Sequence, residues 1–554
     1  MPSSTKSYIR ILLRRFNSVF SFSQQTRAFK RLARENRVPK AKSNKLVLVE
    51  YRYWPDQMLA LIGALPPILQ FHNSNARIYE MFPTTSKVFK MKRILKHKFS
   101  TLNAITKSKY LHISASSVVD SGHQIIINQL ISCRNQKTFE EFKYREILIG
   151  DLIYDHFLRK TKSTTLDFDN TSLPFFISEF LQYCDKFLDY FRNNEIEAVV
   201  VSHPVYHFGI PLRVALHYEI PGYLVDIRRF TKVLEISDSP YNIDWRNLRQ
   251  TFKTFDPKVR ALALDYAKKR IELRNSGDKS DLGGETKSKF KWSGTFDIKS
   301  LTPSKPSVLI ALHDFIDSCH RYGNSFYPDF QMWLNDLGEL SSSSNLVWLI
   351  KPHPWALLDV REMLREFIQR YPHIKIINPE TDNRILVEKG LKYCLTVHGH
   401  IAHELPALGV AVINASVNHP HQDYDFSYTA RDLESYREVI KNLESFKYQA
   451  NLEDLREFYY MHYVYNLLSW CIPNYAEFVK DLEGRRELNT ERVFSWYLKT
   501  RNKYELACLK QAVTEFLKGR ESILGRSHFP TEFCIFPRSC ACGNLSRDFS
   551  SRLS

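Results

Sequence analysis

The chain has 554 residues, 44% of them hydrophobic and 25% charged, with a formal net charge of +18. This composition is that of a globular protein and excludes a disordered or fibrous chain, and the length predicts two or three domains. The longest apolar stretch, Met58–Phe71, is too short to span a bilayer and contains two prolines. Arg10, Arg14 and Arg15 interrupt the apolar residues that a signal peptide would need. We therefore expect a cytoplasmic protein.

Residues 1–44 form a basic arm with eleven Lys or Arg residues and one acid, a net charge of +10. Aliphatic and aromatic residues lie between these cations, as in amphipathic segments that bind an anionic membrane surface. Peripheral binding to the inner face of the membrane is therefore one prediction. We give equal weight to the alternative that the arm is a solvated extension or a helix packed on the rest of the protein. Nucleic acid is not expected, because no nucleic-acid motif is present.

Residues 45–274 alternate between short apolar runs, which indicate buried strands, and segments with helical periodicity. They predict one Rossmann-like α/β domain. The predicted strands are Lys45–Glu50, Ala76–Tyr79, Ala198–Ser202 and Gly222–Asp226, and the predicted helices are Trp54–Phe71, Ile147–Arg159, Phe175–Phe191 and Ile210–His217.

A Gly-, Ser- and Lys-rich linker is expected at residues 275–307, followed by a second Rossmann-like domain at 308–429. Its strands alternate with helices, which predicts a doubly wound parallel sheet. Residues 430–523 are predicted to be helical and to pack across both halves, and 524–554 to be a flexible tail. The predicted strands are Val308–Leu312, Leu346–Ile350, Ile374–Ile377, Leu391–Val397 and Val410–Ala415, with a helix at Leu357–Tyr371.

Two of these strands end in polar turns, at the sheet edge where parallel sheets bind ligands. The first turn is Lys-Pro-His-Pro, in which His353 could donate to a phosphate oxygen and Lys351 could add a charge. In the second, a helix beginning near His400 would offer free N–H groups to a phosphate, and Glu404 would accept two ribose hydroxyls. The alternative for the first turn is that it merely ends the strand, and the alternative for the second is that Glu404 is an ordinary surface residue. The candidate nucleotide- and phosphate-binding residues are Lys351, His353, His398, Gly399, His400 and Glu404.

The loop after the first strand of the second half carries His313, Asp314, Asp317 and His320. These residue types permit a metal site, as in a metal-dependent phosphohydrolase, but the loop lacks a clear further ligand set. We therefore expect no metal ion, and hydrogen bonds from this loop to the substrates, with Asp314 or Asp317 as the candidate base.

His203 and Tyr206 follow a buried strand of the first half and are predicted to face the cleft between the two halves. His421 lies in a loop after the last strand and is the third candidate in this group. On the Ile147–Arg159 helix, Asp151 and Asp155 would repel each other unless a cation such as Arg213 is near. The nine cysteines are scattered, which favours reduced thiols over disulfides.

The second half resembles the capsular and surface-polysaccharide biosynthesis transferases, including their Kdo-transferase-like members. The segments that carry this resemblance are LIALHDFIDSCHRYG (309–323), WLIKPHP (348–354), TVHGHIAHELPALGVAVINAS (396–416) and NHPHQDYDF (418–426). The resemblance implies the GT-B architecture, with two facing doubly wound domains and closing helices. It also implies a nucleotide-sugar donor bound by residues 308–429, a surface glycan or glycolipid acceptor bound by residues 45–274, and no cofactor. His203, Tyr206 and His421 would then be the candidates for contact with the acceptor. The alternatives are a CDP-glycerol-type polyol-phosphate transferase and a non-catalytic assembly scaffold.

Overall fold

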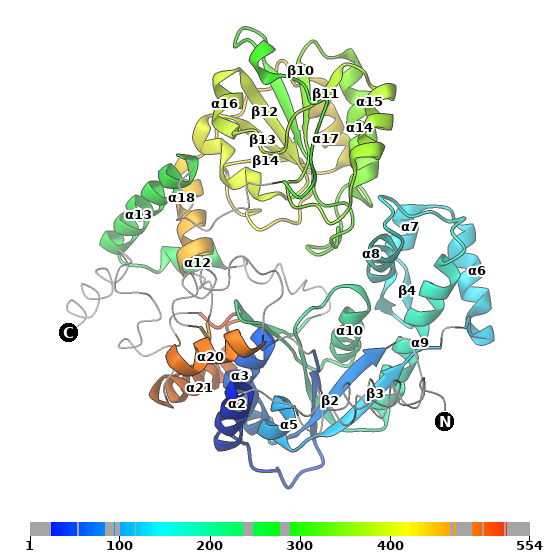
Figure 1. Cartoon of the computed structure of the whole chain (residues 1–554), viewed down its shortest axis with the longest axis vertical. Helices are drawn as coiled ribbons and strands as arrows, with labels where there is room; N and C mark the ends of the chain where they lie inside the picture. Colours follow the sequence, from blue (N-terminus) through cyan, green and yellow to red (C-terminus); the bar gives the residue numbers. More distant parts are fainter. Residues whose placement is uncertain are drawn as a thin grey trace, which may run out of the picture.

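The computed structural model of the chain describes residues 24–52, 55–82, 94, 100–116, 118–235, 247–276, 288–465, 470–472, 490–500, 503–525 and 528. Predictions for residues 1–23 of the arm, 277–287 of the linker and most of the tail lie outside the described residues. The described chain forms two α/β lobes, which lie one above the other in Figure 1.

The N-terminal lobe contains a six-stranded sheet with the order β3-β2-β1-β6-β7-β8. Its strands are parallel except for β8, which pairs antiparallel with β7. This is a doubly wound order, and it reverses between β1 and β6. The strands are β1 (Leu46–Glu50), β2 (Asn75–Phe82), β3 (Lys109–Ser114), β6 (Ile196–Val201), β7 (Gly222–Val225) and β8 (Phe230–Val233), and a separate hairpin joins β4 (Lys143–Tyr144) and β5 (Ile147–Leu148).

The C-terminal lobe repeats this plan with a parallel sheet of order β11-β10-β9-β12-β13-β14. Its order reverses between β9 and β12. The predicted fold class, two doubly wound Rossmann-type lobes of the GT-B kind with further helices after them, is confirmed. The strands are β9 (Ser307–Ala311), β10 (Val347–Lys351), β11 (Ile374–Ile376), β12 (Leu391–Thr396), β13 (Ala411–Asn414) and β14 (Tyr428–Thr429).

Helices cover both faces of each sheet. Alternate residues of a strand point to opposite sides, so each buried strand contributes apolar side chains to a core on both faces. In β1, Leu48 packs toward α8 to α10, whereas Val47 and Val49 pack toward α3. In β9, Val308 and Leu309 divide in the same way between two cores. The helices of the N-terminal lobe are α3 (Pro55–Phe71), α5 (Thr101–Thr106), α6 (Gln124–Ser132), α7 (Gln136–Glu140), α8 (Gly150–Thr161), α9 (Leu173–Arg192) and α10 (Ile210–His217). Those of the C-terminal lobe are α14 (Phe330–Leu340), α15 (Arg361–Arg370), α16 (Asn383–Glu388) and α17 (Leu433–Lys441).

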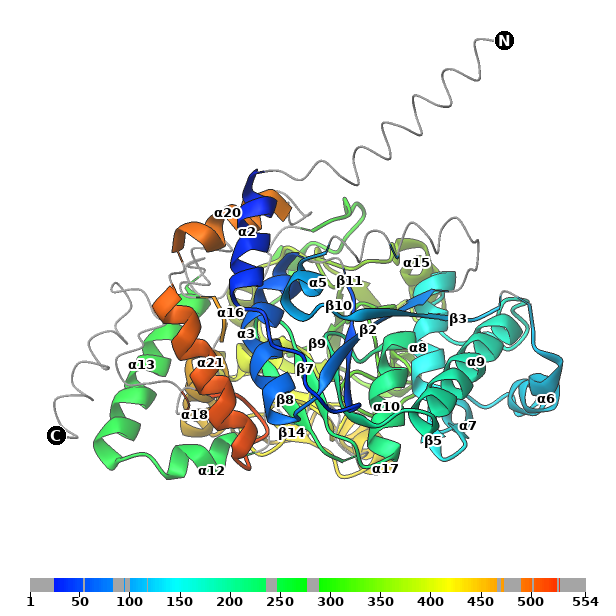
Figure 2. The same cartoon turned by 90° about the horizontal axis from the view of Figure 1, so that it is seen from below.

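The remaining helices lie beside the lobes, as Figures 1 and 2 show. They are α2 (Gln24–Glu35), α12 (Leu248–Lys253), α13 (Pro257–Asn275), α18 (Leu452–Tyr460), α20 (Thr490–Thr500) and α21 (Lys503–Lys518). Helix α13 packs on α18, and α21 returns to the N-terminal lobe to pack on α3. Among the described helices, none is both long and apolar enough to cross a membrane.

Helix α2 belongs to the body of the protein. Phe29 is fully buried and stacks on Phe494 of α20, with ring centroids 4.1 Å apart. Of the two alternatives for the arm, the packed helix therefore holds for Gln24–Glu35, while Arg27, Arg31 and Arg34 on the same helix stay exposed.

Three sequence predictions are wrong in detail. Each sheet has six strands, since the edge strands β3, β8 and β14 were not predicted. The helix expected at Leu357–Tyr371 begins only at Arg361, after a turn. The α-helix expected from His400 is instead two 3-10 segments, His400–His403 and Leu405–Leu408. Pro406 lacks a backbone donor and disfavours helical backbone at the residue before it, and Gly409 in the left-handed region ends the second segment at φ 81°.

Candidate functional site

The turns that follow the central strands of the two lobes meet at the junction between the lobes. Tyr206 follows β6 and Asp317 follows β9, and their Oη and Oδ1 atoms lie 3.4 Å apart. Arg159 of α8 also approaches Asp317, with 3.9 Å between Nη1 and Oδ1. The polar turns predicted from sequence thus lie where strand ends from both sheets come together, the usual place for a ligand in open α/β sheets.

In the loop after β9, His313 and Asp314 hold other turns in place. His313 Nε2 accepts a hydrogen bond from the Val397 N–H at 3.1 Å, and burial lowers the pKa of His313 to about 3. The neutral ring also stacks on Phe330, with centroids 4.5 Å apart. Asp314 Oδ2 accepts from the Leu357 N–H at 2.8 Å, which ties this loop to the turn after β10. Both side chains therefore position the neighbouring turns.

Asp317 is the carboxylate of this loop that faces the other lobe. Its side chain is 52% exposed, in contact range of Tyr206 and Arg159. Tyr206 itself has a left-handed backbone, with φ 54°, which a Tyr adopts only when its surroundings enforce it. Of the two predicted base candidates, Asp317 has the open position.

His320 lies apart from the other residues of the loop. Its Nδ1 is 2.7 Å from Asp155 Oδ1, and its Nε2 is 2.9 Å from Glu140 Oε2. Burial by itself disfavours the imidazolium, but Cys319 and Asp155 beside it raise the pKa of His320 well above its usual value. The four residues considered as one metal-binding loop therefore do not converge, and His320 is instead buried between the two lobes.

At the end of β10, the side chain of Lys351 already has two hydrogen-bond partners. Its Nζ donates to the Thr381 carbonyl and to Asn383 Oδ1, both at 2.7 Å, and burial lowers its pKa. His353 is solvent-accessible, and its Nδ1 accepts from the Trp355 N–H at 3.1 Å, so the proton of the neutral ring is on Nε2. The crowded surroundings lower the pKa of His353, while Asp317 acts in the opposite direction.

The turn after β12 does not end in a helix N-terminus, because only a four-residue 3-10 segment follows it. Gly399 is nevertheless needed here, since a Cβ would lie 2.6 Å from the Thr396 hydroxyl oxygen. Glu404 Oε1 accepts from Arg274 Nε at 3.0 Å and from Nη2 at 2.6 Å. This ion pair fixes the carboxylate from α13, 130 residues away in the chain.

His400 lies among cations from both lobes. Burial is the main cause that lowers its pKa to about 4, followed by the nearby basic groups Arg321, Arg274, His353 and Arg228. On the N-terminal lobe, His203 has its pKa lowered to about 3 by burial and then by Arg52, Arg321 and Arg159. Arg321 acts on both histidines and links the two groups. We call these cations the interlobe basic cluster, which consists of Arg52, Arg159, Arg228, Arg274 and Arg321.

Sequence reasoning missed this cluster, although a signal for part of it was present. Arg52 and Arg228 follow β1 and β7 by two and three residues, and Arg321 lies in the loop after β9. The strand-end rule that selected Lys351 and His353 would have selected these three as well. Arg274 carried no such signal, because its place depends on how α13 packs.

His421 was wrongly placed on the acceptor side. It is fully buried, its Nδ1 lies 3.0 Å from His403 Nε2, and its ring stacks on Phe426. It belongs to a group of histidines that burial keeps neutral by lowering their pKa values. We call this group the histidine cluster, which consists of His398, His403, His419 and His421.

The expected partner of the acidic helix residues is present. Arg213 Nη1 and Nη2 each donate to one oxygen of Asp151 at 2.6 Å, a bidentate pair with only 5% of the Asp151 side chain exposed. Asp155 has a different partner, His320. The repulsion predicted between these two carboxylates is thus relieved by two separate cations.

No protein-family model matches the chain, and no curated protein matches it. Similar solved structures include the UDP-GlcNAc 2-epimerase from Neisseria meningitidis bound to UDP-GlcNAc, with 11% sequence identity and a TM-score of 0.23. The match covers 82% of this chain and 98% of that chain. A glycosyltransferase from Rickettsia africae has 10% identity, coverage of 80% and 100%, and a TM-score of 0.25. MurG from Acinetobacter baumannii has 12% identity, coverage of 75% and 94%, and a TM-score of 0.21. At these TM-scores we draw no conclusion about the site from the similar structures. The fold is assigned from the strand order of the two sheets.

Proposed function

We propose that the chain is a GT-B-type glycosyltransferase that moves a sugar from a nucleotide-activated donor to a surface or capsular polysaccharide, or to its lipid-linked precursor. The observation that carries this proposal is the interlobe basic cluster. Arginines from both lobes lie near enough to His400 and His203, at the ends of parallel strands, for their charges to lower the pKa of each histidine. Cations held in this position suit a ligand with phosphate charge, and arginine binds phosphate through paired N–H groups.

The donor would lie mainly on the C-terminal lobe. His353 donates from Nε2, and Arg321 and Arg274 supply charge near the phosphates, while Glu404 accepts from the ribose hydroxyls. The pairing with Arg274 supports this role, because both Arg274 contacts fall on Oε1 of Glu404. Lys351 would act at a distance, since its Nζ is held by Thr381 and Asn383.

The acceptor would approach from the N-terminal lobe, beside His203 and Tyr206. In an inverting reaction Asp317 takes the proton of the acceptor hydroxyl, whose oxygen forms a bond to the anomeric carbon. The bond from that carbon to the phosphate oxygen breaks, and the arginines stabilise the negative charge on the leaving nucleotide. The exposed position of Asp317 between the lobes supports this assignment.

The membrane surface is a proposed partner through residues 1–23 and the exposed face of α2. Arg27, Arg31 and Arg34 are exposed on that helix, whereas Phe29 on its other face is buried. A lipid-linked acceptor would be found more readily by an enzyme held at an anionic surface.

A panel of CMP, CDP, UDP and GDP, tested by thermal shift, checks the nucleotide site, since ligands stabilise the folded state by mass action. Arg321→Gln should weaken binding of the preferred nucleotide by about 1–3 kcal/mol, the loss expected for charge-assisted contacts. The matched control is Arg365→Gln, an exposed arginine on α15. Equal binding by both variants, or no stabilisation by any nucleotide, contradicts the proposal. Product analysis with sugar- and polyol-linked donors separates sugar transfer from polyol-phosphate transfer.

A further inference from the structure

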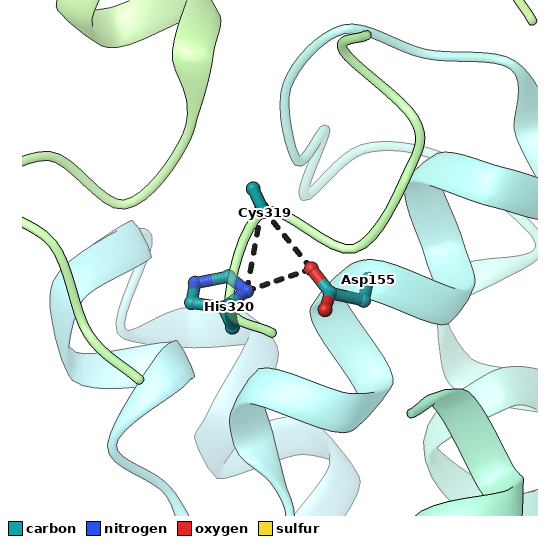
Figure 3. A group of neighbouring side chains, drawn as sticks. All are labelled: Asp155, Cys319 and His320. Atoms are coloured by element: carbon teal, nitrogen blue, oxygen red, sulfur yellow. Dashed lines mark hydrogen bonds and ion pairs between the residues drawn. The ribbon is translucent and has the colours of Figure 1, made fainter. Parts of the chain in front are cut away.

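Four side chains from the two lobes meet in a buried cluster that the proposed reaction does not use. Asp155 lies on α8 and Glu140 on α7, whereas Cys319 and His320 lie in the loop after β9. Figure 3 shows Asp155, Cys319 and His320 pointing toward one another. The side chains of His320, Asp155 and Glu140 are 3%, 2% and 0% exposed.

We propose that Asp155, Cys319 and His320 bind a Zn²⁺ ion that joins the two lobes, with Glu140 as the outer partner of His320. The three ligand atoms are Asp155 Oδ1, Cys319 Sγ and His320 Nδ1. Sγ lies 3.0 Å from Oδ1 and 3.3 Å from Nδ1, and Nδ1 lies 2.7 Å from Oδ1. The three ligand atoms therefore form one compact group.

These distances are close to those of a zinc coordination sphere. With metal–ligand distances of about 2.0–2.3 Å and tetrahedral angles, neighbouring ligand atoms lie roughly 3.4–3.6 Å apart. Small rotations of the three side chains would open the cluster by that amount. A thiolate, an imidazole and a carboxylate are the ligand types of zinc sites, and the soft thiolate disfavours Mg²⁺ and Ca²⁺. The Pro328 carbonyl oxygen, 3.7 Å from Cys319 Sγ, is the nearest candidate for a fourth ligand.

Glu140 provides a second, independent indication. A metal-bound histidine almost always donates its other ring N–H to a carboxylate, carbonyl or water, which fixes the ring. Here His320 Nε2 lies 2.9 Å from Glu140 Oε2, on the side of the ring opposite to the three ligand atoms. Glu140 is held in turn by an ion pair with Lys137.

The test measures metal in the full-length protein. We expect about one Zn²⁺ per chain after purification, and Co²⁺ exchanged into the site should give a sulfur-to-cobalt charge-transfer band. Cys319→Ser should abolish that band and keep the hydrogen bond to Asp155, whereas Cys184→Ser, at a buried cysteine on α9, should leave it unchanged. Glu140→Gln should weaken Zn²⁺ affinity about 10- to 100-fold.

The wild-type protein provides a measurement that does not depend on how the variants fold. Removal of Zn²⁺ by a chelator should lower the melting temperature, and added Zn²⁺ should restore it. No cobalt–sulfur band in the wild type, or a band that persists in Cys319→Ser, overturns the proposal. Both results are independent of nucleotide binding, so they do not decide the proposed transferase activity.

Discussion

Glu404→Gln tests the nucleotide site most directly, because it keeps the size of the side chain and removes its charge. In the structure Glu404 accepts two charge-assisted hydrogen bonds from Arg274, at 3.0 and 2.6 Å, with 17% of the Arg274 side chain and 25% of the Glu404 side chain exposed. Hydrogen bonds to charged groups contribute roughly 1.5–3 kcal/mol, and partial exposure reduces this. We expect the loss of folding stability to lie at the low end of that range.

The effect on the ligand should be larger than the effect on the fold. If Glu404 accepts from the ribose hydroxyls, Glu404→Gln should weaken nucleotide binding by about 1–3 kcal/mol, or roughly 5- to 150-fold. Arg274→Gln should weaken it as well, because Arg274 holds the carboxylate in place and adds charge near the phosphates. Glu388→Gln, at an exposed glutamate at the end of α16, is the matched control.

Isothermal titration calorimetry with a nucleotide and its 2′-deoxy analogue completes the test. The analogue should already bind weakly to the native protein, and Glu404→Gln should weaken it little further, because two changes that remove one interaction are not additive. If the two losses simply add, Glu404 does not contact the ribose. The nucleotide would then have to be placed elsewhere at the lobe junction.

Three further predictions concern the base, the arm and the buried histidines. Asp317→Asn should lower turnover about 10²- to 10⁴-fold with nucleotide affinity unchanged, and near-normal turnover would exclude it as the base. Removal of residues 2–23, which include four cations and no acid, should weaken binding to anionic vesicles by up to about 4 kcal/mol at low salt, and equal vesicle binding would exclude a role of this segment. The pKa values of the four histidines in the histidine cluster are lowered in the folded state. The folded protein is therefore most stable where these histidines are neutral, above their pKa in the unfolded chain. Its free energy of unfolding should decrease as the pH falls below that value. Each histidine should cost about 1.4 kcal/mol per pH unit below 6.5, and equal denaturant midpoints at pH 7.5 and 5.5 would contradict this.

The sequence by itself determined the strands, most of the helices and the fold class. Apolar runs such as Val47–Val49 and Val308–Ile310 are buried on both faces of their sheets. A continuous apolar run by itself indicates such a buried strand, so these strands could be predicted without knowing the rest of the fold. The strand-end rule also located Lys351, His353 and Asp317 at the carboxyl ends of strands in the second sheet. The edge strand β14 was missed because it has two residues, both only partly buried, and thus gave no apolar run.

Only the tertiary structure decided which of the selected polar residues face the lobe junction and which are enclosed. His320 and His421 looked equivalent to His353 in the sequence, yet both are buried among partners far away in the chain. His320 meets Glu140 across 180 residues, and Glu404 meets Arg274 across 130. A polar side chain shows its own chemistry in the sequence, but its partner depends on how two lobes pack, and local periodicity contains no record of that packing.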